Sequence, residues 1–394
     1  MNDALPGRAE APGLYLHVPF CLSKCIYCDF ASATDQGLRE LWLRTLTREV
    51  EHFALRRGEA PEAHAFFGEQ VRWPAFDTLY WGGGTPSLLS PKELEEVMEL
   101  VTTHFELLPT AELTLEANPD DVTPARLELW RQLGFTRLSL GVQSLCDEEL
   151  VWLQRRHNAI EARRAFEAAR EAGFDDISMD LMYGLPGQDL SVWRETLGLV
   201  VSQWQPTHLS CYQLTVAQDT PLGRLVADGG CEPCDESKQR DFFVVTHDQL
   251  EAAGYEHYEI SNFALPGSRS RHNQKYWKHV SYLGLGAAAH SFDGSRRWWN
   301  HCLLSDYGAA WSRRGRPFAD AERLDRDQLR LEQLMLGFRT ADGVPLAVAL
   351  AGPGGQRAVD ELLSQGLVRI DQDRLQPTCQ GFLVADRLPL ALVG

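Results

Sequence analysis

The sequence predicts an α/β protein built from a partial parallel (β/α)6 barrel, followed by a smaller C-terminal domain that is helical and winged-helix-like. The main observation is that six strand–helix units follow one another between residues 14 and 253, a series typical of parallel barrels. This alternation stops after about residue 300, where helical patterns surround a short hairpin. Polar and glycine-rich motifs also fall at the carboxyl ends of the expected strands, where such barrels place their sites.

The six expected strands are short, mainly apolar runs, and each precedes a helical pattern. The strands are expected at residues 14–18, 78–81, 113–117, 138–142, 177–182 and 208–214. The first three helices are expected at 38–54, from residue 91 and from residue 124. The fourth strand is followed by a short helix and then by a second helix that begins at residue 159. The last two helices are expected at 190–203 and 238–253. Ser90 with Glu93, and Asn158 with Glu161, have the spacing of capping boxes, and Pro124 suits the first position of a helix.

The last part of the chain predicts helices at 329–338 and 357–365, a hairpin of 367–370 with 374–376, and a final helix at 379–387. From Asp320 onward there are 8 Arg, no Lys and 11 acidic residues. This balance disfavours DNA binding despite the winged-helix pattern, because such binding needs clustered cations. A packing or lid role is the better interpretation.

These patterns divide the chain into three parts. Residues 1–13 are rich in Pro, Gly and Ala and are predicted to be a disordered N-terminus. Residues 14–300 form the expected barrel, and residues 301–394 form the expected C-terminal domain. The segment 58–74 is predicted to be an exposed insertion in the first crossover.

Composition excludes several classes of function. The 394 residues include 38 Lys and Arg against 55 Asp and Glu, and the resulting net charge of −17 disfavours a nucleic-acid partner. No run of 18 apolar residues predicts a membrane span, and the start has no apolar signal-peptide core. We therefore predict a cytoplasmic protein. Its 9 cysteines then stay reduced, and a cluster of them is more typical of a metal site than of disulfides.

Three cysteines, Cys21, Cys25 and Cys28, follow the first expected strand with the spacing C-x3-C-x2-C. Soft thiolate ligands suit iron–sulfur chemistry, and three of them on one loop can hold three irons of a [4Fe–4S] cluster. No fourth cysteine completes the loop, which leaves one iron open for a small molecule. The alternatives are a zinc knuckle, a redox pair or three buried thiols.

Four further motifs lie near the ends of later strands. Gly83 and Gly84 belong to the run WGGGTPS, where the absence of side chains lets the backbone approach a ligand closely. A plain tight turn is the alternative interpretation of this run. Glu116, in LEANP, can accept hydrogen bonds from hydroxyl or ammonium groups; a solvated Glu before a turn is the alternative. Gln143 ends the fourth strand in GVQS, and Asp180 lies inside an apolar run, where a carboxylate requires a partner.

The order CxxxCxxC, GGGTP, LEANP, GVQS, DLMYGLPGQ resembles the radical S-adenosylmethionine (SAM) enzymes, and among them the oxygen-independent coproporphyrinogen III oxidases and their relatives. The resemblance covers about residues 14–290 and implies a radical SAM partial barrel. It implies that Tyr15 and Gly83 contact SAM beside the cluster and that Glu116 holds its ribose or methionine part. The resemblance also implies residues that correspond, in the oxidases, to positions around SAM and around a second SAM-sized site. In this chain they are Tyr27, Gly84, Thr85, Gln143, Arg155 and Asp180.

Two departures from the oxidases point to a sister group. The oxidases carry a fourth cysteine two places after the third, where this chain has Phe30, and they have a longer N-terminal region. Both features resemble the heme chaperones of the HemW group, which also share an HNxxYW element, here His272 with Tyr276 and Trp277. This resemblance implies heme bound by the imidazole and packed on the two rings. Without it, a lone His at an aromatic core edge would be the simpler interpretation.

The resemblance thus implies a heme chaperone that holds a [4Fe–4S] cluster, SAM and heme and passes heme to a recipient hemoprotein, respiratory and membrane-associated or otherwise. The alternative is an oxygen-independent coproporphyrinogen III oxidase, and a radical SAM methyltransferase on another tetrapyrrole has less support. Enzymatic turnover and a homodimer are both left open. Two other features are interpreted as structural: Cys231 and Cys234 as free thiols of a loop, and residues 284–289 as a close-packed strand or turn.

Overall fold

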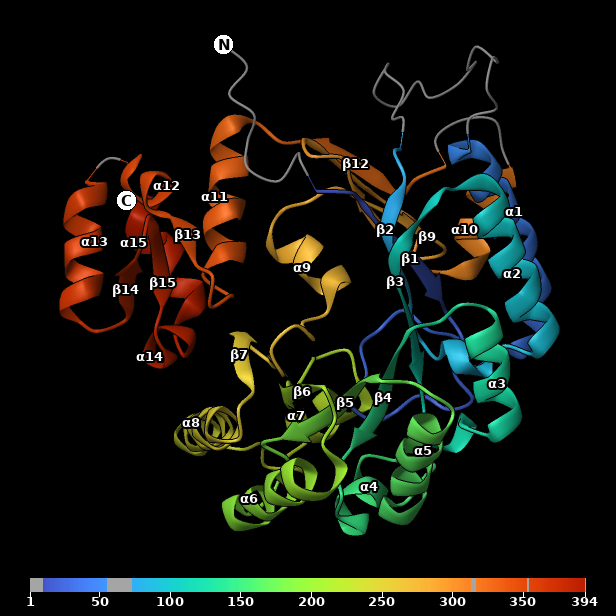
Figure 1. Ribbon diagram of the computed structural model, residues 1–394, viewed down its shortest axis with the longest axis horizontal. Helices are drawn as coiled ribbons and strands as arrows, with labels where there is room; N and C mark the ends of the chain where they lie inside the picture. Colours follow the sequence, from blue (N-terminus) through green and yellow to red (C-terminus); the bar gives the residue numbers. More distant parts are fainter. Residues whose placement is uncertain (1–9, 55–72, 313–316, 353, 394) are drawn as a thin grey trace.

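The computed structural model describes residues 10–54, 73–312, 317–352 and 354–393. Residues 1–9 of the expected N-terminal segment and residues 58–72 of the expected insertion lie outside the described residues. Figure 1 shows a large curved sheet with helices around it and a small domain, formed by the end of the chain, at one side.

Six parallel strands in sequential order form the centre of the large sheet, which confirms the predicted fold class. These are β1 (Gly13–Val18), β2 (Phe76–Gly83), β3 (Leu107–Ala117), β4 (Arg137–Gln143), β5 (Asp176–Tyr183) and β6 (His208–Gln213). A seventh parallel strand that we did not predict as part of the series, β9 (Tyr282–Leu285), pairs with β1 on its other side. The strand next to β6 is the antiparallel β8 (Asn262–Ala264), so β1 and β6 each have another neighbour and the barrel is open, as predicted.

The crossover helices cover the outer face of this sheet (Figure 1). They are α1 (Arg39–Phe53), α2 (Pro91–His104), α3 (Pro124–Gln132), α4 (Asp147–Trp152), α5 (Ala159–Glu171) and α6 (Leu190–Leu199). Helix α1 shows why these helices pack on the sheet. It has an apolar residue at every fourth position, and these residues, Trp42, Leu46 and Val50, are buried in the main core. Both predicted capping boxes form, at the start of α2 and of α5. The helix expected over 190–203 is confirmed: α6 continues directly into a π-helix at Val200–Trp204.

Short antiparallel strands extend both edges of the sheet. Strands β7 (Glu256–Glu259) and β8 lie beyond β6, and β10 (His290–Phe292), β11 (Arg296–Trp299) and β12 (Asp320–Arg323) lie beyond β9. The helices in this part are α7 (Pro221–Ala227), α8 (Glu236–Ala252), α9 (Arg271–Trp277) and α10 (Leu304–Ser312). Because β12 still pairs with β11, the large sheet continues past residue 300, where we placed the domain boundary.

Two smaller interpretations agree with the structure. The segment 284–289 is the end of β9 and a tight turn, and a side chain at Gly284 would lie 2.0 Å from the carbonyl oxygen of His290. Cys231 and Cys234 are free thiols in the loop between α7 and α8.

The C-terminal domain has its own apolar core, which includes Leu334, Phe338, Val359 and Leu375. Its elements are α11 (Arg326–Gly337), β13 (Val344–Pro345), α12 (Leu346–Leu350), α13 (Gly355–Ser364), β14 (Val368–Asp371), β15 (Arg374–Pro377), α14 (Cys379–Phe382) and α15 (Leu388–Val393). The predicted wing is confirmed: β14 and β15 form the hairpin, and β13 adds a third strand. The single helix predicted at 379–387 is wrong, because the chain turns between α14 and α15.

Short 3-10 turns occupy Gln36–Leu38, Pro86–Leu88, Pro119–Asp121 and Ala385–Arg387. Within the described ranges, no helix has both the length and the apolar character needed to cross a membrane.

Candidate functional site

A cavity of about 330 Å³ opens at the carboxyl ends of the parallel strands. The loop after β1 forms one wall, and the ends of β2 to β6 form the floor and the other walls. The predicted site residues that line it are Cys21, Cys25, Tyr27, Cys28, Gly83, Gly84, Thr85, Glu116, Gln143, Arg155 and Asp180. Its size lies within the range of small-molecule sites.

The cysteine loop is closed by its own backbone hydrogen bonds and tied to β1. Cys21 N–H donates to the carbonyl oxygen of Ala33 at 3.0 Å, which closes the loop, and Cys28 N–H donates to Cys25 at 3.2 Å in a tight turn. His17, from β1, contacts the carbonyl oxygen of Ala31 through Nε2 at 2.8 Å. These contacts hold three half-buried thiols on one wall of the cavity.

The surroundings of the sulfur atoms fit an iron–sulfur cluster. Thr85 Oγ1 donates to Cys21 Sγ, and Arg155 Nη1 to Cys25 Sγ, both at 3.5 Å. Donors of this kind stabilise thiolate charge, while burial raises the pKa of the free Cys28 thiol. No three His, Cys, Asp or Glu side chains among the described residues are grouped to hold a single metal ion.

Glu116 lies on the floor of the cavity with its carboxylate already oriented. Tyr80 donates to Oε1 at 2.8 Å, and the backbone N–H of Gly83 donates to Oε2 at 3.1 Å. Burial raises the pKa of Glu116 to about 7, although the hydrogen bond from Tyr80 opposes the shift. The carboxyl group therefore changes its charge near neutral pH, beside the space where a ligand would bind.

The two glycines of the β2 end are required by the protein itself. Gly83 has φ +112°, and a Cβ there would lie 2.6 Å from the imidazole of His17. A Cβ on Gly84 would lie 2.7 Å from the carbonyl oxygen of Phe20. A side chain at either position would therefore meet β1 or the cysteine loop, while both glycines line the cavity. That their backbone approaches a ligand there stays a prediction.

Gln143, Arg155 and Asp180 also line the cavity, and Arg155 reaches the cysteine loop. Gln143 has φ +69°, unusual for a residue other than glycine, where the pairing of β4 with β5 is irregular. Arg155 Nη2 donates to Asn118 Oδ1 at 2.5 Å and to the carbonyl oxygen of Gly141 at 2.7 Å. Asp180, predicted to need a partner, accepts from Ser139 Oγ at 3.2 Å, and burial raises its pKa.

Sequence reasoning missed two residues of the cavity. Asn118 joins Arg155 to Thr85, and its position two residues after Glu116 in the same motif was the available signal. Tyr212, near the end of β6, lines the cavity and is 41% exposed. Its place near a strand end was a weaker signal.

Four predicted site residues lie elsewhere. Tyr15 is below the cavity, where its ring stacks on Tyr80 and its hydroxyl contacts His17 Nδ1 at 3.0 Å. His272 is 1% exposed inside the barrel, and its Nε2 contacts the Tyr276 hydroxyl at 2.8 Å. Trp277, one residue further, lines a separate cleft of about 420 Å³ between α9 and the C-terminal domain.

Heme does not fit at His272 in this conformation. Its Nδ1 contacts Thr78 Oγ1 at 2.8 Å, so both ring nitrogens are engaged. Burial lowers the pKa of His272 to about 3, which keeps the ring neutral, as a ligand requires. An iron atom, however, would have to replace one of the two hydrogen bonds and reach a buried ring.

A parallel partial barrel with a three-cysteine loop at its mouth defines a radical SAM protein. The model of the radical SAM superfamily matches residues 15–200, and that of the HemN C-terminal domain matches residues 324–384. The structure is also similar to the coproporphyrinogen III oxidase HemN of Escherichia coli, with a TM-score of 0.80 over 98% of this chain and 91% of that one. At 24% identity this similarity shows the fold alone.

Sequence relatives specify the family. The heme chaperone HemW of Mycobacterium tuberculosis (strain CDC 1551) is 36% identical over 99% of this chain and 98% of its own length. The heme chaperone HemW of Escherichia coli (strain K12) is 33% identical over 95% and 96%, respectively. The chain belongs to the HemW family of heme chaperones.

Proposed function

We propose that this protein binds heme and transfers it to a recipient hemoprotein, and that it does so on a frame that also holds a [4Fe–4S] cluster and SAM. The observation that carries the proposal is the similarity, over nearly the whole chain, to relatives named heme chaperones. The chain also carries the cysteine loop and the HNxxYW element that the resemblance to this family implies.

Different residues of the cavity would hold the [4Fe–4S] cluster and SAM. Cys21, Cys25 and Cys28 would hold three irons of the cluster, and bound SAM would supply the 5′-deoxyadenosyl group that a reduced cluster can release as a radical. Arg155 offsets the negative charge of the thiolates through its contact with Cys25. Glu116, in its ionised form, accepts hydrogen bonds from SAM.

The remaining walls would orient the ligand. The amide of Gln143 and the carboxylate of Asp180 face the same space as Glu116 and offer a donor and acceptors at fixed positions. Tyr27, within the cysteine loop, and Thr85, which donates to Cys21 Sγ, line the same cavity.

Coproporphyrinogen III oxidation is the second candidate, because the fold is shared with that oxidase. Phe30 argues against it. Where the oxidases have a further cysteine, this chain presents a phenyl ring that is 64% exposed at the cavity rim. A phenyl ring supplies neither a thiol nor a ligand.

We place the protein in the cytoplasm, where reducing conditions suit its free cysteines. The recipient we propose is a hemoprotein, respiratory and membrane-associated or otherwise. The net charge of −17 supports a partner other than nucleic acid.

Product analysis separates the two candidates. Anaerobically purified protein with an intact cluster is incubated with coproporphyrinogen III, SAM and a reductant, and the tetrapyrroles are separated by chromatography. We expect coproporphyrinogen III to remain unchanged. Conversion to protoporphyrinogen IX, lost in the Cys25→Ala variant, would assign the chain to the oxidases instead.

A further inference from the structure

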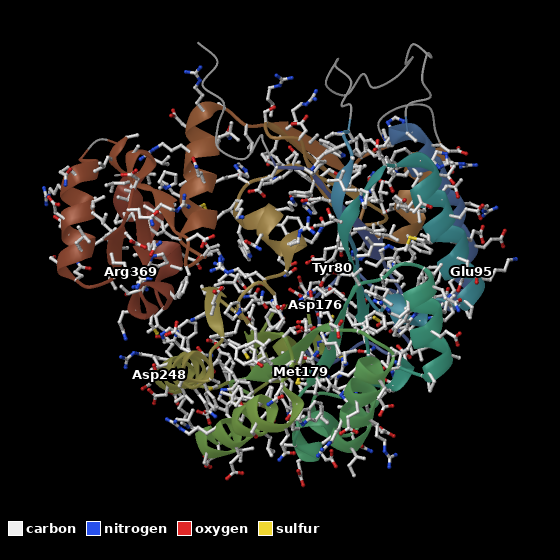
Figure 2. All side chains as sticks on the ribbon, viewed as in Figure 1. Tyr80, Glu95, Asp176, Met179, Asp248 and Arg369 are labelled. Atoms are coloured by element: carbon white, nitrogen blue, oxygen red, sulfur yellow. The ribbon has the colours of Figure 1, made fainter. Side chains whose placement is uncertain are left out.

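Asn118 directly follows β3, at a position where the side chain of an asparagine commonly caps the next helical turn. It precedes the 3-10 turn Pro119–Asp121, yet its side chain forms no cap hydrogen bond with that turn. Its backbone is held on one side by Ser87, whose Oγ accepts the Asn118 N–H at 3.3 Å. The strand end is also held from within, because Tyr80, in the interior of the molecule in Figure 2, donates to Glu116. The amide of Asn118 is thus fixed in place and is not used as a cap.

Both ends of this amide contact the side chains that donate to the cysteine sulfurs. Asn118 Oδ1 accepts from Arg155 Nη2 at 2.5 Å, and Nδ2 donates to Thr85 Oγ1 at 3.5 Å. Arg155 in turn donates to Cys25 Sγ, and Thr85 donates to Cys21 Sγ, each at 3.5 Å. We refer to Asn118, Arg155 and Thr85 as the sulfur-donor network. One half-buried amide therefore joins the donors of two different thiols.

The amide orients both donors. Within the described residues, the buried Nε of Arg155 has no hydrogen-bond partner, so Asn118 and the carbonyl oxygen of Gly141 hold the guanidinium next to the sulfur. The hydroxyl of Thr85 has a single proton to donate. Because Asn118 Nδ2 occupies an acceptor site of that hydroxyl, the proton is directed to Cys21.

We infer that Asn118 is a positioning residue that raises the reduction potential of the [4Fe–4S] cluster, an inference that rests on the proposed cluster. Reduction adds one electron from a low-potential reductant, and no bond or proton changes. Hydrogen bonds and positive charge beside the cysteine sulfurs stabilise the added negative charge, and they therefore favour the reduced form. Asn118 acts without touching a sulfur, through the two side chains that do.

The test is a potentiometric titration of the SAM-free, cluster-bearing protein with dithionite, followed by the paramagnetic signal of the reduced cluster. Asn118→Ala should lower the equilibrium constant for reduction by about tenfold, which is about 59 mV for a one-electron couple. Gln213→Ala is the matched control. It removes another amide that lines the cavity, and within the described residues that side chain forms no hydrogen bond with Arg155, Thr85 or the cysteines. It should keep the wild-type potential.

Two further backgrounds show whether Asn118 acts through its partners. Thr85→Val removes one donor at nearly unchanged shape, and Arg155→Ala removes the other. Adding Asn118→Ala to either variant should shift the potential less than it does in the wild type, because residues that act through one another are not additive. The full shift in both backgrounds would show that Asn118 acts by itself and would overturn the positioning role.

Iron and sulfide analysis of every variant separates the outcomes. An unchanged or higher potential in Asn118→Ala, or an equal fall in Gln213→Ala, would overturn the inference while the proposed function stands. If Asn118→Ala assembled no cluster, Asn118→Asp would replace it, since it keeps an acceptor for Arg155 but loses the donor to Thr85. A potential at or above that of the wild type in Asn118→Asp would also overturn the inference. A wild-type protein that assembles no [4Fe–4S] cluster would reject the proposed cluster and the inference together.

Discussion

At the scale of single residues, Arg155 connects three motifs that are far apart in the sequence. Its guanidinium contacts Cys25 Sγ, Asn118 Oδ1 and the carbonyl oxygen of Gly141. One side chain thus joins the cysteine loop, the end of β3 and the end of β4. The sequence predicted that these motifs meet, because parallel strands end at the same edge, but only the structure shows which atoms meet.

Cys21, Cys25 and Cys28 should be the only protein ligands of the cluster. Replacing any one of them with Ala should abolish the visible charge-transfer absorbance and the paramagnetic signal of the reduced protein, because each thiolate binds a different iron. Cys231→Ala and Cys234→Ala are the matched controls and should keep both signals. Cluster loss in the controls, with the triad variants unaffected, would contradict the assignment.

The carboxyl group of Glu116 should make SAM binding depend on pH. Its pKa is raised to about 7, so it is mostly protonated at pH 6 and mostly ionised at pH 8. If the ionised form accepts hydrogen bonds from SAM, affinity should be about tenfold higher at pH 8 than at pH 6. Equilibrium dialysis measures it, and Glu116→Gln should bind weakly with a flat profile; a steep profile in that variant would exclude Glu116 as the cause.

At the scale of elements, the end of β4 is shaped by the left-handed conformation of Gln143. The irregular pairing with β5 turns the strand end and brings the amide to the cavity. Asn158 and Glu161 cap the helix that follows, so that this crossover begins at a fixed point.

Substitutions at Gln143 should reveal this backbone strain. Gln143→Gly should be more stable than Gln143→Ala by about 1 kcal/mol, because only glycine adopts the left-handed region without cost. Urea denaturation measures the difference. Glu148 is an exposed residue of helix α4 and serves as the control position. There, Glu148→Gly should be less stable than Glu148→Ala by about 1 kcal/mol, because glycine is a poor helix former. If the Gly variant were less stable than the Ala variant at both positions, the strained conformation of Gln143 would be contradicted.

The elements that could be predicted are those with a periodic pattern. The six parallel strands, both capping boxes and the wing have such patterns, and they occur as expected. Strands β8 and β10 to β12 have three or four residues each, too few to show a period. Helix α9 was missed for another reason: its buried residues, His272 and Lys275, are polar, and no local pattern tells that they face inward.

At the scale of the whole molecule, the two candidate ligand regions lie at opposite ends of one barrel. The cavity with the cysteine loop is at the carboxyl ends of the strands, and α9 is near the amino ends of β1 and β2. The C-terminal domain contacts the barrel near α9, where Arg269 pairs with Asp342 at 3.0 Å. A ligand bound at α9 would therefore not share its space with a ligand bound in the cavity.

The most direct test is a heme titration of the anaerobically purified, cluster-bearing and SAM-free protein, followed by the Soret band. We predict saturation at one heme per chain. His272→Ala should lower heme affinity at least about tenfold at unchanged iron and sulfide content, since it removes the axial ligand. A wild-type protein that gives no saturable Soret band, or a His272→Ala variant that binds heme as tightly as wild type, would contradict heme binding through α9.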